Sequence, residues 1–222
     1  MTKAAVLWTG GKDCALACHE ASLAGHEIAL LVTLTGQDSR FRAHPLPVMR
    51  EQADAMGVPH RVVTVGEPYD QAYRRAICAL RDDDGVGLLV TGDIAPVGGY
   101  PNWIRQCAAG SGVNVLTPLW EMERQDLLRR VLAAGFRVVF SCVKRPWLEP
   151  DWAGRALSAD AIDELVRRAA ISGLDASGEQ GEYHTLVLDG PIFRRTPRLE
   201  PATWVRRTDG DLTYLDAGVG AT

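Results

Sequence analysis

The sequence of 222 residues contains no long hydrophobic run. No stretch approaches the roughly 18–20 consecutive apolar residues that a helix needs to cross a bilayer. The first residues do not form a secretory signal pattern either, because Lys3 is followed by a short apolar run and then by Gly-Gly-Lys-Asp. We therefore expect a cytoplasmic protein without a membrane partner.

Cysteine is also scarce. The chain has five cysteines, an odd number, and no two of them are spaced as Cys-x-x-Cys. This argues against a disulfide framework and against a zinc ribbon. It fits the reducing environment of the cytoplasm.

An excess of basic charge is missing too. The chain carries 24 Lys and Arg against 28 Asp and Glu, which gives a formal net charge of -4. A broad nucleic-acid-binding face needs the opposite balance, so nucleic acid is not an expected partner, while a local basic patch stays open. The 46% hydrophobic and 23% charged residues are typical of a globular protein. The length predicts one large core and a smaller partner domain.

Short β-branched runs alternate with amphipathic stretches through the first two thirds of the chain. This rhythm predicts an α/β fold, with a Rossmann-like, mainly parallel sheet and helices on both faces. This alternation of strand-like and helix-like segments ends near residue 145. Further along the chain, Asp209-Gly210 predicts a hairpin. We expect a first domain at residues 1–145 and a smaller C-terminal α+β domain at 146–222. The expected strands are 4–8, 28–35, 61–65, 86–91, 136–143, 183–188, 203–208 and 212–215, and the expected helices are 13–24, 47–56, 69–81, 103–109, 121–134 and 158–170.

A glycine-rich segment, Thr9-Gly10-Gly11-Lys12-Asp13-Cys14, connects the first expected strand to the first expected helix. In a parallel α/β sheet, ligands bind where the chain leaves the carboxyl end of a strand. Two glycines let the backbone approach an anion closely. The backbone N–H groups and the positive end of the helix dipole then favour phosphate, with the lysine as a further positive charge. The plainer alternative is a Gly-Gly turn with a solvated lysine and an aspartate that caps the helix.

This segment fits neither G-x-x-x-x-G-K-[ST] nor G-x-G-x-x-G. It resembles the PP-loop, usually S-G-G-K-D-S, of the ATP-pyrophosphatase superfamily, with Thr9 and Cys14 in place of the two serines. That superfamily cleaves ATP between the α and β phosphates and transfers AMP to a substrate. The resemblance implies that Thr9 to Cys14 bind ATP within residues 1–145, with Mg²⁺ held by Asp13, since Mg²⁺ is usually bound by one or two carboxylates plus phosphates and water.

A second motif, Glu179-Gln180-Gly181-Glu182-Tyr183-His184-Thr185, follows Gly178. It resembles the G-E-x-G-E-Y-E/H-T signature of the diphthine–ammonia ligase family. The blocks 91–94, 118–120 and 134–136 match other blocks of that family in order and spacing, so the resemblance covers most of the chain. Ser177 stands where many members have cysteine, which argues against an essential thiolate there. Residues 95–101 lack the polar, basic character of many members, so recognition of the acceptor is expected to differ.

The resemblance implies an ATP-dependent amide ligase, which adenylates a carboxylate and transfers ammonia to it. Because ammonia is mostly ammonium at neutral pH, a nearby base must accept a proton. Glu179, Glu182 and His184 are the candidates in the C-terminal domain, with Thr185 as a hydroxyl donor. The plainer alternative is a solvated acidic loop with His184 on the surface.

Two further places complete the expected site. His44 is expected to face it, as a similar histidine does in relatives. Gly92 and Asp93 follow the fourth expected strand and are expected to face the nucleotide.

The expected partners are free ammonia and a carboxylate, either a small molecule or one borne by a protein. The sequence leaves the acceptor and the oligomeric state open, a homodimer included. Two other functions remain as alternatives, a tRNA-modifying enzyme with a PP-loop and a non-catalytic sensor of adenine nucleotides.

Overall fold

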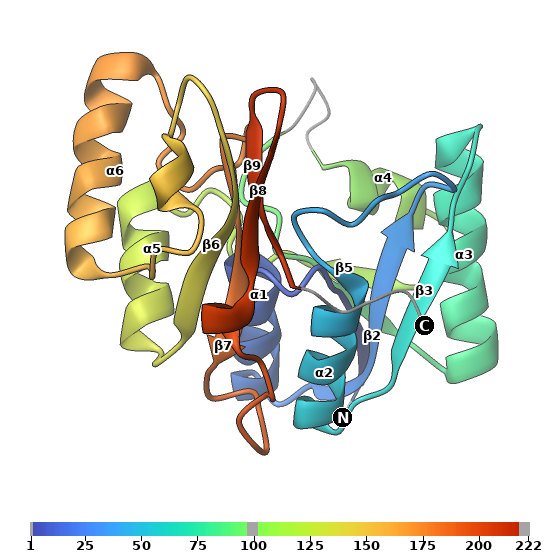
Figure 1. Cartoon of the computed structure of the whole chain (residues 1–222). Coiled ribbons are helices and arrows are strands. Elements are labelled where there is room, and N and C mark those ends of the chain that lie inside the picture. Colours follow the sequence, from blue (N-terminus) through green and yellow to red (C-terminus); the bar gives the residue numbers. More distant parts are fainter. Residues whose placement is uncertain (1, 97–101, 218–222) are drawn as a thin grey trace. The chain divides into compact units, whose positions relative to one another are not determined.

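The computed structural model describes residues 2–96 and 102–217, so part of the segment 95–101 lies outside the described residues. The chain forms two compact units, and both are built from several separate stretches of sequence (Figure 1). The first unit comprises Met1–Thr9, Asp13–Arg40 and Gly57–Glu121, and the second comprises Gly10–Lys12, Phe41–Met56 and Met122–Thr222.

The first unit contains a five-stranded parallel sheet in the order β3-β2-β1-β4-β5. Its strands are β1 (Lys3–Leu7), β2 (Glu27–Thr35), β3 (His60–Thr64), β4 (Leu88–Val90) and β5 (Asn114–Leu116). Its helices are α1 (Lys12–Leu23, whose first residue is assigned to the second unit), α3 (Tyr69–Asp84) and α4 (Trp103–Ala108). The Rossmann-like parallel sheet predicted from the sequence is confirmed. The short strand β5 was not predicted.

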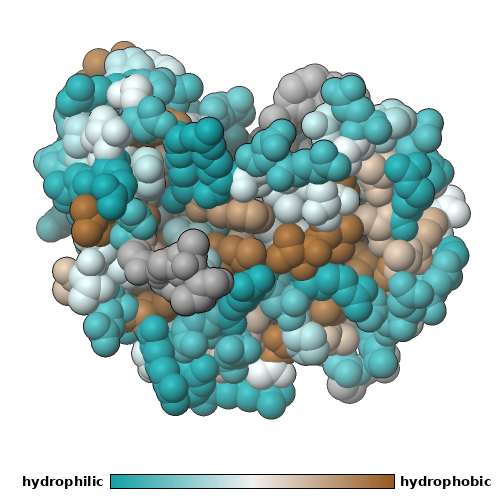
Figure 2. Space-filling model, turned by 45° about the vertical axis from the view of Figure 1, so that its right-hand side comes forward, coloured by the Kyte–Doolittle hydropathy of each residue, from teal (hydrophilic) through white to brown (hydrophobic). Residues whose placement is uncertain are grey.

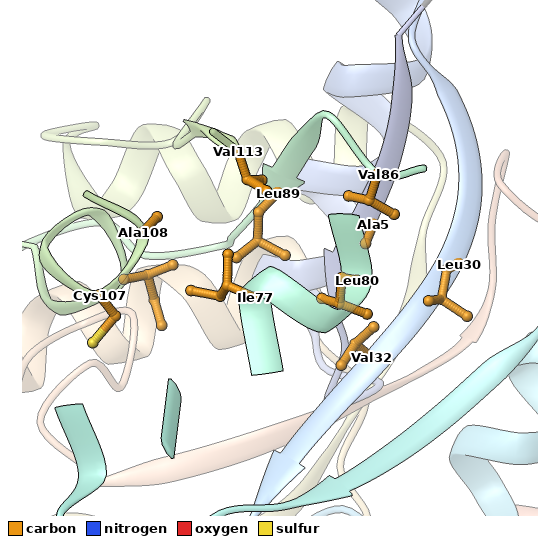
Figure 3. Packing of buried hydrophobic residues seen from close by; sticks show 11 residues of the cluster. Ala5, Leu30, Val32, Ile77, Leu80, Val86, Leu89, Cys107, Ala108 and Val113 are labelled. Atoms are coloured by element: carbon orange, nitrogen blue, oxygen red, sulfur yellow. The ribbon is translucent and has the colours of Figure 1, made fainter. Parts of the chain in front are cut away.

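Helices cover both faces of this sheet. The connections β1-α1-β2 and β3-α3-β4 run in opposite directions across it, and right-handed crossovers then place α1 and α3 on opposite faces. On one face, α3 and α4 pack against alternate strand residues in a cluster of buried side chains (Figure 3). This cluster includes Ala5, Leu30, Val32, Ile77, Leu80, Val86, Leu89, Cys107, Ala108 and Val113. The helices on both faces were predicted correctly.

The second unit contains a four-stranded antiparallel sheet in the order β7-β6-β9-β8. Asp209 pairs with Leu212 across the turn at Gly210, whose φ is 63°, so the predicted hairpin is confirmed. The strands are β6 (Arg137–Lys144), β7 (Tyr183–Asp189), β8 (Val205–Asp209) and β9 (Leu212–Asp216). The helices are α2 (Leu46–Met56), α5 (Arg124–Ala133) and α6 (Ala159–Ser172), with short 3-10 turns η1 (Pro150–Trp152) and η2 (Pro201–Thr203).

Two features of the second unit differ from the expectation. The strand expected at 136–143 exists as β6, but it pairs antiparallel with β7 and β9 instead of joining the parallel sheet. Residues 41–56, including α2, also belong to the second unit. The structural division after Glu121 therefore differs from the expected boundary near residue 145. An apolar pattern in the sequence predicts a strand or the buried face of a helix, but it does not predict which other element packs against it.

Helix ends follow their capping residues. The helix expected from residue 121 begins at Arg124, because the carboxylate of Glu123 accepts hydrogen bonds from the backbone N–H groups of Gln125 and Asp126. Ser158 caps α6, and Gly173 closes it in a left-handed conformation.

Hydrophilic residues cover most of the face seen in Figure 2, and hydrophobic residues are confined to parts of it. The exposed large hydrophobic side chains lie on five different elements. They are Leu23, Val62, Tyr69, Ile171 and Val205. Within residues 2–96 and 102–217, no helix is long and apolar enough to span a membrane.

Candidate functional site

The first unit has a cavity at the carboxyl ends of its central strands. The chain proceeds from β1 to β2 and β3 on one side and from β4 to β5 on the other, so the order reverses between β1 and β4. Ligands of open α/β sheets bind at such a reversal. The cavity has a volume of about 280 Å³. Its lining residues are Leu7, Trp8, Thr9, Asp13, Cys14, Val32, Thr33, Leu34, Tyr73, Thr91, Gly92, Asp93 and Ile104.

The structure therefore brings together five of the residues predicted to bind the nucleotide. They are Thr9, Asp13, Cys14, Gly92 and Asp93. The side chains of Thr9 and Cys14, which replace the two serines of the PP-loop pattern, lie within hydrogen-bonding distance, with 3.6 Å between Oγ1 and Sγ. The lining thus combines the carboxylates of Asp13 and Asp93 with apolar side chains such as Leu7, Val32 and Leu34.

Gly92 has a steric reason to be glycine. A Cβ atom at this position would lie 2.6 Å from the carbonyl carbon of Asp13 and 2.7 Å from the backbone nitrogen of Cys14. The segment after β4 therefore touches the backbone at the start of α1, and any larger residue would push the two apart.

The plainer alternative, in which Asp13 caps α1, does not match the structure, because the helix begins at Lys12 and Asp13 lies in its first turn. Asp93 is half-buried. Burial raises the pKa of its carboxyl group, and hydrogen bonds from Thr91 and the amide of Asn102 offset only part of this effect.

Residues Gly10 to Lys12 make their described contacts within the second unit. Gly10 has a φ of 77°, and its carbonyl oxygen accepts hydrogen bonds from Val187 N at 2.9 Å and from Gln52 Nε2 at 3.0 Å. The same amide nitrogen of Gln52 donates to Val187 O at 2.7 Å, and the side chain is fully buried. Gln52 thus ties the loop to strand β7.

Gln52 was not predicted as a site residue from the sequence. Its signal was a polar residue on the apolar face of the helix expected at 47–56, beside Met49, Ala53 and Met56. A glutamine in such a position must find buried hydrogen-bond partners.

Lys12 is buried, with 3% of its surface exposed. Its backbone N–H donates to Thr185 Oγ1 at 3.1 Å, and its Nζ donates to Ser177 O at 2.6 Å. The ammonium group also lies 5.3 Å from the centroid of the Tyr183 ring. The backbone amide of Lys12, expected to bind phosphate, is therefore engaged by Thr185. Because the Thr185 hydroxyl accepts this bond, its own hydrogen is directed to another acceptor.

Two histidines lie beside the loop. The rings of His44 and His184 are in edge-to-face contact, with centroids 5.1 Å apart and an interplanar angle of 78°. A Cβ atom on Gly11 would lie 3.4 Å from His44 Cε1 and 3.2 Å from Thr185 O. The second unit therefore gathers Gly11, Lys12, His44, His184 and Thr185, all predicted as site residues.

The two predicted acids of the second motif differ in their surroundings. Glu182 is 2% exposed, and each of its carboxylate oxygens accepts a backbone hydrogen bond, Oε1 from Asp175 N at 2.9 Å and Oε2 from Gln180 N at 3.0 Å. Glu179 is half-buried. Glu182 thus shapes the loop that carries Glu179.

The comparisons with known proteins cover nearly the whole chain. A family model described as the N-terminal domain of diphthamide synthase matches residues 2–114, and one described as its C-terminal domain matches residues 123–216. The chain belongs to the diphthamide synthase family. Neither model matches residues 115–122, and the structure changes from the first unit to the second within this gap, between Glu121 and Met122.

Curated relatives in this family are identical to the chain at about a quarter of the aligned positions. A diphthine–ammonia ligase of Schizosaccharomyces pombe is 25% identical over 94% of this chain, which spans only 38% of that relative. The enzymes of the same name from mouse and human are 23% and 24% identical over 87% of this chain, and the matches cover 81% of each of them.

A solved structure described as a predicted subunit of tRNA methyltransferase from Methanocaldococcus jannaschii is 18% identical, with a TM-score of 0.47. The match covers 88% of this chain and 100% of that one.

Proposed function

We propose that this protein is an ATP-dependent amide ligase, which joins ammonia to a carboxylate with formation of AMP and pyrophosphate. The observation that carries the proposal is the cavity at the strand-order reversal, where Thr9, Asp13 and Cys14 of the PP-loop-like segment meet Gly92 and Asp93. Membership in the diphthamide synthase family supports the same reaction class. The names of the relatives make diphthine the first acceptor to test.

The lining of the cavity suits a nucleotide that is bound as a magnesium complex. Apolar walls from Leu7, Val32 and Leu34 suit the base, and the lining includes two carboxylates but no lysine or arginine. A polyphosphate beside Asp13 and Asp93 therefore needs a cation. Among the described residues no group of three or more His, Cys, Asp or Glu could hold a metal without other ligands. This fits Mg²⁺, which usually combines one or two carboxylates with phosphate oxygens and water.

In the first step, a carboxylate oxygen of the acceptor attacks the α-phosphorus of ATP, and pyrophosphate leaves with the electron pair of the broken P–O bond. Bound Mg²⁺ would neutralise charge on the leaving group. Asp13 would hold the metal complex, and the ammonium group of Lys12 would contribute positive charge to the phosphates. This role needs Lys12 to exchange its bond to Ser177 O for a phosphate oxygen, or to share its three hydrogens between them.

In the second step, the ammonia nitrogen attacks the acyl carbon of the adenylate, and AMP leaves. The surplus proton must pass to a base. Glu179 and His184 are the proposed acceptors, because both oxygens of Glu182 are occupied by backbone N–H groups. The Thr185 hydroxyl is the proposed donor to the substrate, since its oxygen already accepts from Lys12 N.

An ATP–pyrophosphate exchange assay across candidate carboxylates, diphthine included, tests the proposal. We expect exchange that depends on one acceptor, and we expect Lys12→Ala and Asp13→Ala to reduce it strongly. Lys144→Ala is a matched control, because this lysine is half exposed and pairs with Asp211 on the surface. ATP binding without any pyrophosphate release, with every acceptor, would instead identify a nucleotide sensor. Exchange that requires tRNA would identify a tRNA-modifying enzyme.

A further inference from the structure

The loop between α6 and β7 is organised around the carboxylate of Asp175. Its Oδ1 accepts hydrogen bonds from Ser177 N at 2.9 Å and from Ser177 Oγ at 2.7 Å. Arg124 Nε, at the first residue of α5, lies 2.9 Å from Oδ2 and 3.1 Å from Oδ1. Both side chains are largely shielded from solvent, with 26% of Arg124 and 13% of Asp175 exposed.

The charge state of Asp175 is fixed by these contacts. Burial alone would raise the pKa of its carboxyl group, but the hydrogen bonds from Ser177 and Arg124 outweigh burial and lower the pKa. Asp175 is therefore an anion at neutral pH, and Arg124 is its cation. A shielded, hydrogen-bonded pair of this kind fixes geometry better than an exposed ion pair does.

The geometry that the pair fixes continues to Lys12. Asp175 accepts hydrogen bonds from the backbone N–H and the hydroxyl group of Ser177. The carbonyl oxygen of the same Ser177 accepts a hydrogen bond from Lys12 Nζ at 2.6 Å. The next residue, Gly178, has a φ of 77°, and a Cβ atom there would lie 2.9 Å from Tyr183 O. The peptide that presents the carbonyl to Lys12 is thus held on both sides.

We propose that Arg124 and Asp175 are positioning residues for Lys12, acting through the Ser177 carbonyl. The effect on nucleotide rests on the proposed function, in which the Lys12 ammonium serves the phosphates of ATP. Arg124 and Asp175 set where that ammonium lies before ATP arrives. Neither residue touches the nucleotide.

The first test needs no ligand. In protein labelled with ¹⁵N-lysine, the buried ammonium of Lys12 gives a resonance that Lys12→Arg removes and thereby assigns. We expect Arg124→Ala to shift or broaden this resonance, Arg124→Lys to retain more of the wild-type signal, and the matched control Arg129→Ala to leave it unchanged. Arg129 lies on the same helix and only approaches Asp163, at 3.7 Å on the surface. An unchanged Lys12 resonance in folded Arg124→Ala and Asp175→Asn proteins would overturn the proposal.

The second test is a double-mutant cycle on ATP affinity, measured by calorimetry. Couplings of this kind typically change affinity by about two- to thirtyfold, and we expect Arg124→Ala to weaken ATP binding within that range. In the Lys12→Ala background the same substitution should have no further effect, because its route to the nucleotide is gone. Equal losses in both backgrounds would show a general structural role and would overturn the proposal.

These results separate the inference from the proposed function. If the protein binds ATP but releases no pyrophosphate, the proposed ligase function is refuted. The double-mutant cycle on ATP affinity then still tests whether Arg124 and Asp175 position Lys12. If it binds no ATP, the proposed function fails, and the ammonium resonance alone decides whether Arg124 and Asp175 position Lys12.

Discussion

Gln52→Leu is the substitution that most directly tests how the glycine-rich loop between β1 and α1 is held. The wild-type side chain is fully buried and uses its amide nitrogen twice, toward Gly10 O at 3.0 Å and toward Val187 O at 2.7 Å. Leucine has a similar volume but no donor. The substitution therefore removes both bonds while leaving the site filled.

The expected loss follows from these two bonds. Each contributes roughly 0.5–1.5 kcal/mol, so Gln52→Leu should reduce the free energy of unfolding by about 1–3 kcal/mol. Gly10 O keeps its bond from Val187 N, which limits the penalty at that end. Gln52→Glu should cost more at neutral pH, because a carboxylate has no hydrogen to offer two carbonyl oxygens. Its deficit should shrink as the pH falls and the carboxyl group gains a proton.

Urea unfolding followed by circular dichroism measures these losses, and calorimetry with ATP measures the effect on the loop. Arg50→Ala is the control on the same helix, because Arg50 is exposed and its replacement should change stability by no more than about 0.5 kcal/mol. Weaker ATP binding is expected for Gln52→Leu and not for the control. If Gln52→Leu unfolds at the same urea concentration as the wild type, the reasoning about the buried amide is refuted.

Three further predictions concern the acidic and steric features of the two units. Gly92→Ala should destabilise the protein by about 1–3 kcal/mol through overpacking, whereas Gly66→Ala, with no atom within 4 Å, is the thermal-melting control. Asp93→Asn should raise the melting temperature at neutral pH and weaken ATP use. Burial raises the pKa of Asp93, so the carboxyl group contributes most to stability at pH values below the pKa it has in the unfolded chain. This contribution is lost as the pH rises through the raised pKa of the folded protein. An Asp93→Asn protein whose stability at neutral pH equals that of the wild type would contradict this. Glu182→Gln should speed hydrogen exchange at Gln180 N, since only one amide oxygen remains to accept two N–H groups, and an unchanged exchange rate would contradict it.

Most elements of the fold could be predicted because their sequence periods are unambiguous. The first strand, the first helix and the Asp209-Gly210 hairpin lie within a residue or two of their expected bounds. Strand β5 was missed because three residues, Asn114–Leu116, are too few to show a period. The partner of β6 could not be predicted, since pairing depends on distant strands rather than on its own pattern.

The residue types of the candidate site could be predicted from the sequence, but the different roles of the individual residues could not. The sequence offers Glu179 and Glu182 as equivalent acids three positions apart. Only the folded loop distinguishes them, by turning the backbone N–H groups of Asp175 and Gln180 toward Glu182. Arg124 could not be predicted for a related reason. Its partner Asp175 lies far away in the sequence, and no local pattern connects the two residues.

The glycines of the loop between β1 and α1 explain why residues distant in sequence must hold it. Gly10 at a φ of 77° adopts a backbone conformation that costs other residues energy, but glycine loses more conformational entropy on folding than any other residue. The loop therefore needs contacts that order it before a nucleotide binds. Val187 and Gln52 hold Gly10, and Thr185 holds the N–H of Lys12, so strand β7 and helix α2 of the second unit supply that order. Because order formed in advance reduces the entropic cost of binding, weakening any of these contacts should lower ATP affinity even where no contact with ATP is lost.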